Sequence, residues 1–251
     1  MTERALKDIA LQFGSLDLDR HAFFFDFDGT LAELVDDPAN VSLAGELAGD
    51  LARLSARTRG AVAIITGRHR DEVAPMLGDI PVAGLHGSDF PGDIARTDQD
   101  AVRMAVIRPL LPALADLVAA HPGAILEDKG AGLALHWRGA PGAAEVMSRA
   151  ADQTLAALGP DWRMQHGKCV AEIRPVGDDK GVALRRFMAE PAFADRRPVA
   201  FGDDLNDLPM LQAARDFGGI AVALGERDLP ADLRLAGPAA LAAWLSERLA
   251  A

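Results

Sequence analysis

The feature that most constrains the fold is an apolar run that ends abruptly in acid and glycine, Phe23-Phe24-Phe25-Asp26-Phe27-Asp28-Gly29-Thr30-Leu31. An uninterrupted apolar run is typical of a strand buried on both faces of a parallel sheet. Because side chains alternate along a strand, Asp26 and Asp28 leave it on the same side. Ligands of open α/β sheets bind beyond the carboxyl ends of such strands. We therefore expect a functional site directly after this strand.

This pair of carboxylates suits phosphoryl transfer through a covalent aspartyl-phosphate. Asp26 is expected to be the nucleophile, a role that carboxylates are known to take. Asp28 is then the acid that protonates the leaving alkoxide and the base that accepts a proton from the attacking water. A solvated loop carrying two acids is the alternative, and the surrounding Phe run and Gly-Thr pair argue against it.

Composition narrows the class of protein. The chain has 251 residues, of which 49% are hydrophobic and 25% charged, enough for one large α/β domain or a core with an insertion. A net charge of −11 argues against a nucleic-acid or anionic-membrane surface. The single cysteine, Cys169, excludes an internal disulfide. Without a recognisable signal peptide or membrane span, a cytoplasmic location is the expectation.

Buried strands alternate with helices at both ends of the sequence. An apolar strand at residues 61–65 ends in Thr66-Gly67-Arg68, and further strands are expected near 82–84, 198–201 and 220–224. Leucines at helical spacing predict a helix between the first two strands. This alternation predicts a doubly wound parallel sheet.

The middle of the chain has a different pattern. We expect, in order, a long helix at 101–120, a β-hairpin at 124–137, a helix at 142–158 and a strand at 169–173. Such a unit suits a small antiparallel α+β module. We interpret it as an insertion, with domain boundaries at 1–103 for the first part of the core, 104–175 for the inserted cap and 176–251 for the second part of the core. A short leading helix at 3–13 and a loop at 36–38 are also expected.

Two further strand ends and a helix start offer partners for a phosphate. The Thr66 hydroxyl and a helix N-terminus after it suit a phosphate oxygen, although an ordinary helix cap explains a lone threonine equally well. Arg68 either reaches the same anion or is a surface charge. Lys180, near the start of a helix, supplies a positive charge to the nucleophile and the transferred group.

Three acids lie close together at one strand end: Asp203, Asp204 and Asp207. Their repulsion is costly unless a cation lies among them. Oxygen ligands beside a phosphate suggest Mg²⁺. We expect the Asp26 carboxylate, the Asp28 backbone carbonyl and Asp203 to bind it, while Asp204 and Asp207 hold metal-bound waters or orient Lys180.

These four motifs, from Asp26-Phe27-Asp28-Gly29-Thr30 to Gly202-Asp203-Asp204, resemble in order those of the haloacid dehalogenase superfamily. The resemblance implies an α/β fold, with a Rossmann-like parallel-sheet core and an inserted α+β cap domain. It also implies hydrolysis through a phosphoaspartate. Dehalogenation is disfavoured because it has no need for Asp28 as an acid.

Three further stretches resemble the trehalose-6-phosphate phosphatase family: Gly84-Leu85-His86-Gly87, residues 126–138, and residues 165–175. The resemblance implies Mg²⁺-dependent hydrolysis of trehalose 6-phosphate by a protein whose partner is a small sugar phosphate, with no nucleic acid or membrane. A monomer is the working expectation. It further implies substrate contacts at Gly67 and Arg68, and sugar hydroxyls held in the cap by Glu127, Lys129, Lys168 and Glu172. A solvated hairpin surface is the alternative for the cap charges.

One motif departs from that family. The family usually carries Gly-Asp-Asp-x-Thr-Asp-Glu, whereas this chain has Gly202-Asp203-Asp204-Leu205-Asn206-Asp207-Leu208. The acids remain, so metal binding is expected to survive, and the departure bears on the substrate. Sucrose-phosphate or mannosyl-3-phosphoglycerate phosphatases are therefore the alternatives. A phosphomutase is a further alternative, which would need a route for returning the phosphoryl group to the substrate instead of to water. A non-catalytic binding protein is disfavoured, because Asp26, Asp28, Lys180 and Asp203 are all present.

Overall fold

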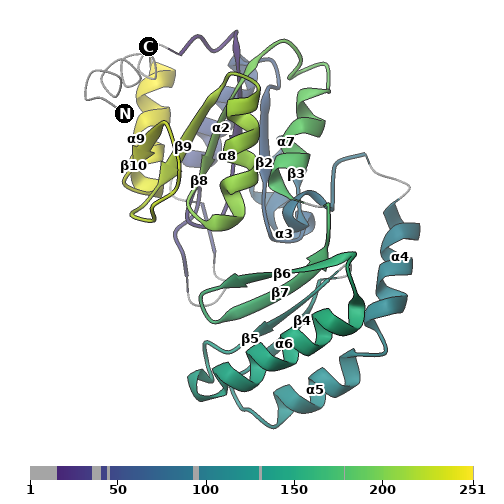
Figure 1. Cartoon of the computed structure of the whole chain (residues 1–251). Helices are drawn as coiled ribbons and strands as arrows, with labels where there is room; N and C mark the ends of the chain where they lie inside the picture. Colours follow the sequence, from purple (N-terminus) through teal and green to yellow (C-terminus); the bar gives the residue numbers. More distant parts are fainter. Residues whose placement is uncertain are drawn as a thin grey trace. The chain divides into compact units, whose positions relative to one another are not determined.

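The computed structural model describes residues 16–35, 41–43, 46–92, 96–129, 132–177 and 179–250. The leading helix expected at 3–13 and the loop expected at 36–38 lie outside this part of the chain. The described residues of Met1–Pro91 and Asp179–Ala251 form one compact unit, and those of Gly92–Asp178 form a second (Figure 1). Within these residues, no helix combines the length and the apolar character that crossing a membrane requires.

The first unit is built on a sheet of six parallel strands in the order β10-β9-β8-β1-β2-β3. The apolar run of the opening motif is β1, which lies between β8 and β2. The α/β fold with a parallel-sheet core is therefore confirmed. The strands are β1 (His21–Phe25), β2 (Val62–Ile65), β3 (Val82–Ala83), β8 (Arg197–Gly202), β9 (Ile220–Leu224) and β10 (Leu233–Leu235).

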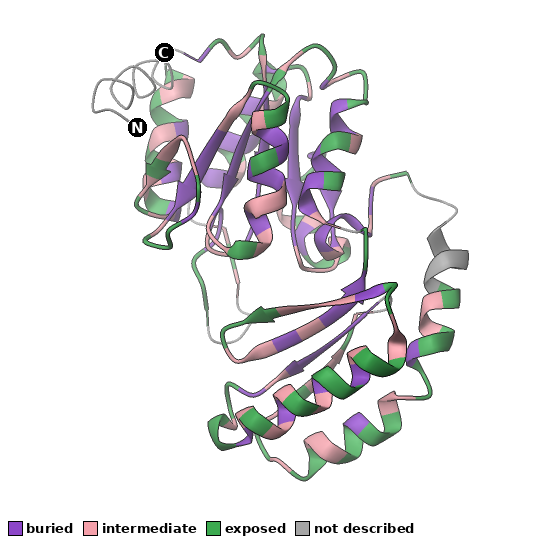
Figure 2. Cartoon of the chain, in the orientation of Figure 1, coloured by how far each residue is buried: buried purple, intermediate pink, exposed green. Residues whose placement is uncertain are grey.

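Helices cover both faces of this sheet, and the alternation along the strands decides which helices lie on each. Bulky residues such as Phe23 and Phe25 pack with α2 and α9 on one face. Small residues such as Ala22, Ala200 and Ala221 pack with α7 and α8 on the other. Figure 2 shows the strands buried along most of their length. The helices are α2 (Leu47–Arg57), α3 (Arg70–Val73), α7 (Lys180–Met188), α8 (Leu208–Asp216) and α9 (Pro238–Ala250).

The second unit has an antiparallel sheet in the order β4-β5-β7-β6. Apolar side chains on one face of the sheet, among them Leu135 and Ile173, form a core with residues of the helices, such as Leu114 and Met147. The elements are α4 (Arg96–Ile107), α5 (Leu111–Ala119), β4 (Ile125–Asp128), β5 (Leu133–His136), α6 (Ala144–Leu158), β6 (Trp162–Gly167) and β7 (Val170–Pro175).

One expected helix was wrong, and two strands were missed. The single helix at 101–120 is two helices, because Pro109 removes a backbone donor and clashes with the preceding turn. Pro112 is tolerated because it lies in the first turn of α5. The polar strand β6 and the short edge strand β10 were not expected, since neither has an apolar run.

Candidate active site

Neighbouring strands of the parallel sheet bring the site residues of the first unit together. Asp26 directly follows β1, Thr66 follows β2 and Asp203 follows β8. The backbone N–H of Asp26 donates to the carbonyl of Phe201 at 3.0 Å, so the sheet itself fixes the position of Asp26. Lys180 is the first residue of α7. The strand ends expected to form the site are therefore adjacent.

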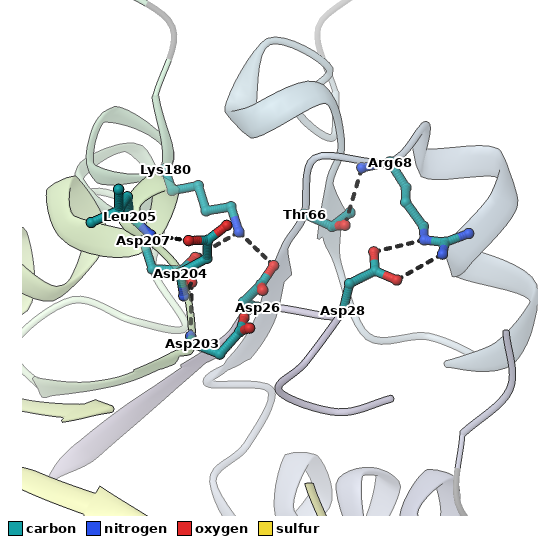
Figure 3. Close-up of polar contacts among 9 residues, drawn as sticks. All are labelled: Asp26, Asp28, Thr66, Arg68, Lys180, Asp203, Asp204, Leu205 and Asp207. Carbon is teal, nitrogen blue, oxygen red and sulfur yellow. Dashed lines mark hydrogen bonds and ion pairs between the residues drawn. The ribbon is translucent and has the colours of Figure 1, made fainter. Parts of the chain in front are cut away.

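Lys180 is a buried cation held between two carboxylates (Figure 3). Its Nζ donates to Oδ1 of Asp26 at 2.5 Å and to Oδ1 of Asp207 at 2.6 Å, and the side chain is only 1% exposed. Oδ2 of Asp207 accepts the backbone N–H groups of Asp203 and Asp204, each at 2.9 Å. Asp207 thus orients Lys180 toward Asp26 and also shapes the loop after β8.

The electrostatic balance of this cluster favours a further cation. Burial alone lowers the pKa of Lys180, but the charges and hydrogen bonds of Asp207 and Asp26 outweigh it and raise that pKa above its ordinary value. Burial, and then the charge of Asp207, raise the pKa of Asp26 well above its ordinary value and that of Asp203 to about 7. One ammonium therefore does not balance three carboxylates in a dry site.

The same carboxylates fit a divalent metal ion. Ligand oxygens of Asp26, Asp203 and Asp207 all lie within 4.8 Å of one another. Oδ1 of Asp203 is buried and has no hydrogen-bond partner in the described part of the chain. A buried carboxylate oxygen without a donor is costly, and a hard cation with oxygen ligands removes that cost. The side chain of Asp28 does not belong to this group.

Gly29 allows the loop after β1 to lie against Asp203. Its φ is +79°, and a Cβ built on it would lie 2.2 Å from Oδ2 of Asp203. A side chain at this position would displace the carboxylate that has the unpartnered oxygen. The glycine thus permits a close approach between two parts of the site itself.

Asp28 points away from the Lys180 cluster and toward Arg68 (Figure 3). Nε and Nη2 of Arg68 donate to the two carboxylate oxygens of Asp28, each at 2.7 Å. This hydrogen bond is the main reason that the pKa of Arg68 is raised, while burial opposes the shift. We expected Arg68 to reach the phosphate or to be a surface charge. Here its guanidinium is hydrogen-bonded to Asp28, the expected general acid.

Thr66 is buried, and its hydroxyl accepts the backbone N–H of Arg68 at 3.1 Å. The helix expected after Thr66 is short: α3 has four residues, begins at Arg70, and is followed by a 3₁₀ turn, η2 (Ala74–Met76). Such a short helix has little macrodipole to offer an anion. The turn after β2, rather than a helix end, therefore surrounds Thr66 and Gly67.

Asp204, expected to hold a metal-bound water or to orient Lys180, lies at the start of a 3₁₀ turn. Its Oδ1 accepts the backbone N–H of Leu205 at 2.7 Å and caps the 3₁₀ turn η5 (Leu205–Asp207). Arg227 forms an ion pair with the same oxygen at 3.0 Å. Asp204 does not contact Lys180, so of the two acids only Asp207 orients the lysine.

The candidate sugar-binding residues lie in the second unit, which is described by itself. Glu127 on β4 and Glu172 on β7 both lie level with Ala134 of β5, so they share one face of the antiparallel sheet. Lys168 is exposed in the turn between β6 and β7. This polar face is opposite the one that packs on the helices.

Glu127 is held by two side chains of the same hairpin. Nε2 of His136 lies 2.8 Å from Oε2 of Glu127, and Nζ of Lys129 lies 3.3 Å from Oε1. Burial opposes ionisation, but the hydrogen bond with His136 and the charge of Lys129 lower the pKa of Glu127. His136 was not singled out from the sequence. The signal that could have identified His136 is its position two residues after Ala134, which places it on the same face of the sheet as Glu127.

Comparisons of the sequence with known proteins find similar proteins of one family. A family model described as trehalose-phosphatase matches residues 24–227. A probable trehalose-phosphate phosphatase of Sinorhizobium fredii is 37% identical over 226 residues, which cover 89% of this chain and 85% of that protein. The trehalose-6-phosphate phosphatase of Escherichia coli K12 is 36% identical over 228 residues, covering 90% of this chain and 85% of that protein.

The fold is similar to that of a solved trehalose-6-phosphate phosphatase related protein. The TM-score is 0.75 at 21% identity, and the match covers 91% of this chain and 97% of that structure. At this identity the likeness concerns the fold alone.

Proposed function

The chain belongs to the trehalose-phosphatase family, and from this premise we propose that it hydrolyses trehalose 6-phosphate to trehalose and phosphate. The observation that carries the proposal is the buried Lys180, which links Asp26 to Asp207. An ammonium fixed on one carboxylate oxygen orients Asp26 and places positive charge where phosphoryl oxygens arrive.

In the first step, a carboxylate oxygen of Asp26 attacks phosphorus and the bond to the sugar oxygen breaks. The electron pair of that bond stays on the sugar oxygen, which takes a proton from Asp28. Lys180 and the turn at Thr66 and Gly67 stabilise the charge on the phosphoryl oxygens. Asp28 cannot donate while Arg68 holds both its oxygens, so this step includes release of at least one of those bonds.

In the second step, a water molecule attacks the phosphorus of the phosphoaspartate. Asp28, now a carboxylate, accepts a proton from that water, and the bond between phosphorus and Asp26 breaks. Asp26 returns to its original state and phosphate is released. Arg68 is placed to hold Asp28 between the two steps, while Asp28 is a carboxylate.

We propose Mg²⁺ as the cofactor, held by the carboxylates of Asp26 and Asp203 and by the backbone carbonyl of Asp28. The unpartnered oxygen of Asp203 supports this assignment, and the position of Asp207 beside both carboxylates supports an orienting role for it. When bound, the ion supplies positive charge that favours the ionised form of Asp26 and offsets the charge of the substrate.

Sugar recognition belongs, in this proposal, to the second unit. Glu127, Lys129, Lys168 and Glu172 are proposed to bind hydroxyl groups of the disaccharide. Charged side chains suit this task because they are left unpaired if a sugar lacks the matching hydroxyl. The shared face of Glu127 and Glu172 supports the assignment. A cytoplasmic location is part of the same proposal.

The test is phosphate release from a panel of phosphomonoesters with Mg²⁺: trehalose 6-phosphate, sucrose 6-phosphate, mannosyl-3-phosphoglycerate, glucose 6-phosphate and p-nitrophenyl phosphate. We expect the highest kcat/KM on trehalose 6-phosphate. Asp26→Asn, which keeps the shape but removes the charge, is expected to lose several orders of magnitude while its fold persists.

The panel also decides between the sugars. The Asn206-Asp207-Leu208 departure from the family motif is the reason to include the two other sugar phosphates. A higher kcat/KM on either of them would change the substrate assignment and leave the proposed phosphatase mechanism unchanged. No phosphate release from any member would refute the proposed function.

A further inference from the structure

His86 is a buried histidine to which the proposed mechanism gives no task. It lies in η3 (Leu85–Gly87), the 3₁₀ turn directly after β3, and is only 3% exposed. Both Leu85 and His86 have left-handed backbone conformations, with φ of 47° and 56°. Two consecutive non-glycine residues in this region are costly, and such strain persists where the surroundings enforce it.

The turn that contains His86 is bonded to the turn after β2. The backbone N–H of Leu85 donates to the carbonyl of Arg68, and that of His86 donates to the carbonyl of Thr66, both at 2.8 Å. These two bonds span the proposed phosphate-binding turn from its first residue to its third. The left-handed backbone directs both N–H groups toward the same neighbour.

The imidazole of His86 covers the α-carbon of Gly67. A Cβ built on Gly67 would lie 2.7 Å from Cε1 and 2.8 Å from Nε2 of the ring. The ring thus occupies the space that a side chain at position 67 would fill. Glycine is required there because the ring approaches the backbone so closely.

On its other side, the same turn lies against the start of α7. Gly87 has φ of +102°, and a Cβ on it would lie 2.8 Å from Cβ of Ala183 and 3.1 Å from the carbonyl oxygen of Asp179. Asp179 caps α7 and immediately precedes Lys180. The turn at 85–87 is therefore packed between the backbone of the phosphate-binding turn and the base of the helix that carries the catalytic lysine.

We infer that His86 is a positioning residue for phosphate binding: its imidazole, packed on Gly67, fixes the Thr66-Gly67-Arg68 turn relative to the start of α7. The inference rests on the proposed function. It places His86 behind the phosphate-binding backbone, where the ring acts through Gly67. The strain at Leu85 and His86 is then the cost of holding the ring against this turn.

The first test is His86→Asn. Asparagine tolerates the left-handed conformation, so the fold is expected to keep its unfolding temperature, while the ring over Gly67 is lost. We expect kcat/KM for p-nitrophenyl phosphate to fall about tenfold, mainly through KM, because the phosphate-binding turn loses its fixed position. The inhibition constant of inorganic phosphate is expected to rise by a similar factor. Asp195→Asn is the matched control, since Asp195 is exposed and also has a positive φ of 62°.

The second test is a double-mutant cycle with Gly67→Ala. In the wild-type background the added methyl group meets the imidazole, whereas in His86→Asn that space is vacant. The loss caused by Gly67→Ala is therefore expected to be at least about fivefold smaller in the His86→Asn background. If His86→Asn does not fold, the cycle is run with His86→Gly, which removes the backbone strain as well.

Independent losses in the cycle would overturn the inference, and so would an unchanged phosphate inhibition constant in His86→Asn. Failure of the proposed function itself is distinguishable, because the wild-type protein would then release no phosphate from any phosphomonoester.

Discussion

Asp28 has two opposite tasks in the proposed reaction, those of an acid and of a base, and its contact with Arg68 bears on both. Both oxygens of Asp28 accept hydrogen bonds from the guanidinium at 2.7 Å, and Arg68 is mostly buried while Asp28 is about one-third exposed. Such a two-pronged pair fixes the carboxylate in orientation as well as in charge. In the proposed reaction Asp28 must be an acid first and a base afterwards, so Arg68 favours the second of these states.

The role of Arg68 predicts a dependence on the leaving group. A sugar alkoxide needs the proton from Asp28, whereas p-nitrophenolate leaves without one. Although Arg68 opposes protonation of Asp28, one remaining bond from its guanidinium keeps Asp28 oriented toward the sugar oxygen, and we expect the loss of that orientation to dominate. Arg68→Gln should therefore lower kcat/KM on trehalose 6-phosphate roughly ten- to a hundredfold, the value of a hydrogen bond to a charged group, and lower it much less on p-nitrophenyl phosphate. Arg68→Lys should recover little because it lacks the planar fork.

Arg70→Gln is the control for that measurement, since Arg70 pairs with Asp89 at 3.5 Å instead of Asp28. Equal losses on both substrates in Arg68→Gln would mean that Arg68 acts on the phosphate and not through Asp28.

Asp203 predicts how metal binding depends on pH. Its pKa in the folded protein is raised from 3.8 to about 7, chiefly by burial and by the charge of Asp207. The folded state then binds the proton more tightly than the unfolded state, so this group makes the metal-free protein less stable as pH rises from about 4 to about 7. Mg²⁺ competes with that proton.

The increase in unfolding temperature on adding Mg²⁺ should consequently be larger at pH 8 than at pH 5. At pH 5, two units below the pKa, the proton weakens the apparent affinity about a hundredfold. At pH 8, a concentration of 100 Kd stabilises by about 2.7 kcal/mol. The measurement is thermal unfolding with and without MgCl₂ at both pH values, with Asp203→Asn as the variant that loses the effect. An equal increase at both pH values would contradict the account.

At the scale of elements, what could be predicted depended on whether the pattern was local. The strand before Asp26, the strand before Thr66 and the helix start at Lys180 are local apolar patterns, and each lies where expected. The proline that divides the expected helix, Pro109, is also a local signal, but the helix-favouring Ala- and Leu-rich segments on both sides led to the prediction of one continuous helix. By contrast, β6 is polar and forms because it pairs with β7, a partner that no local pattern reveals.

The site shows the same division. The acids and the lysine were recognisable as residue types at strand ends. The pairing of Asp28 with Arg68, the cap formed by Asp204 and the ring of His86 on Gly67 depend on side-chain directions in three dimensions. Sequence spacing carries no information on these directions. The Asp28–Arg68 pair and the contact of His86 with Gly67 each join turns that are distant along the chain, whereas the cap formed by Asp204 is a local side-chain arrangement.

At the scale of the whole molecule, the two units divide the proposed work between chemistry and recognition. The nucleophile, the lysine and the acid cluster belong to the first unit, and the proposed sugar contacts belong to the second. A phosphate ester without a sugar needs only the first set. Substitutions in the second set should therefore lower activity on the sugar phosphate and leave activity on a phosphate ester without a sugar unchanged.

Glu172→Ala is the variant that tests this division. Loss of one hydrogen bond to a charged group costs about 1.5–3 kcal/mol, which corresponds to roughly a ten- to hundredfold loss of kcat/KM on trehalose 6-phosphate. Activity on p-nitrophenyl phosphate should stay unchanged. Glu145→Ala, an exposed glutamate on α6 that pairs with Arg149, is the matched control and should affect neither substrate. Parallel losses on both substrates in Glu172→Ala would assign Glu172 to the fold.

The central claim is that trehalose 6-phosphate is hydrolysed through a phosphoaspartate at Asp26. The direct measurement is to quench the enzyme into borohydride during turnover of trehalose 6-phosphate and to map the reduced residue by peptide mass spectrometry, with Asp26→Asn as the control. Borohydride converts an aspartyl-phosphate to homoserine, so the account predicts homoserine at position 26 in the wild-type protein alone. Release of phosphate without homoserine at position 26, or with homoserine at position 28 instead, would contradict it.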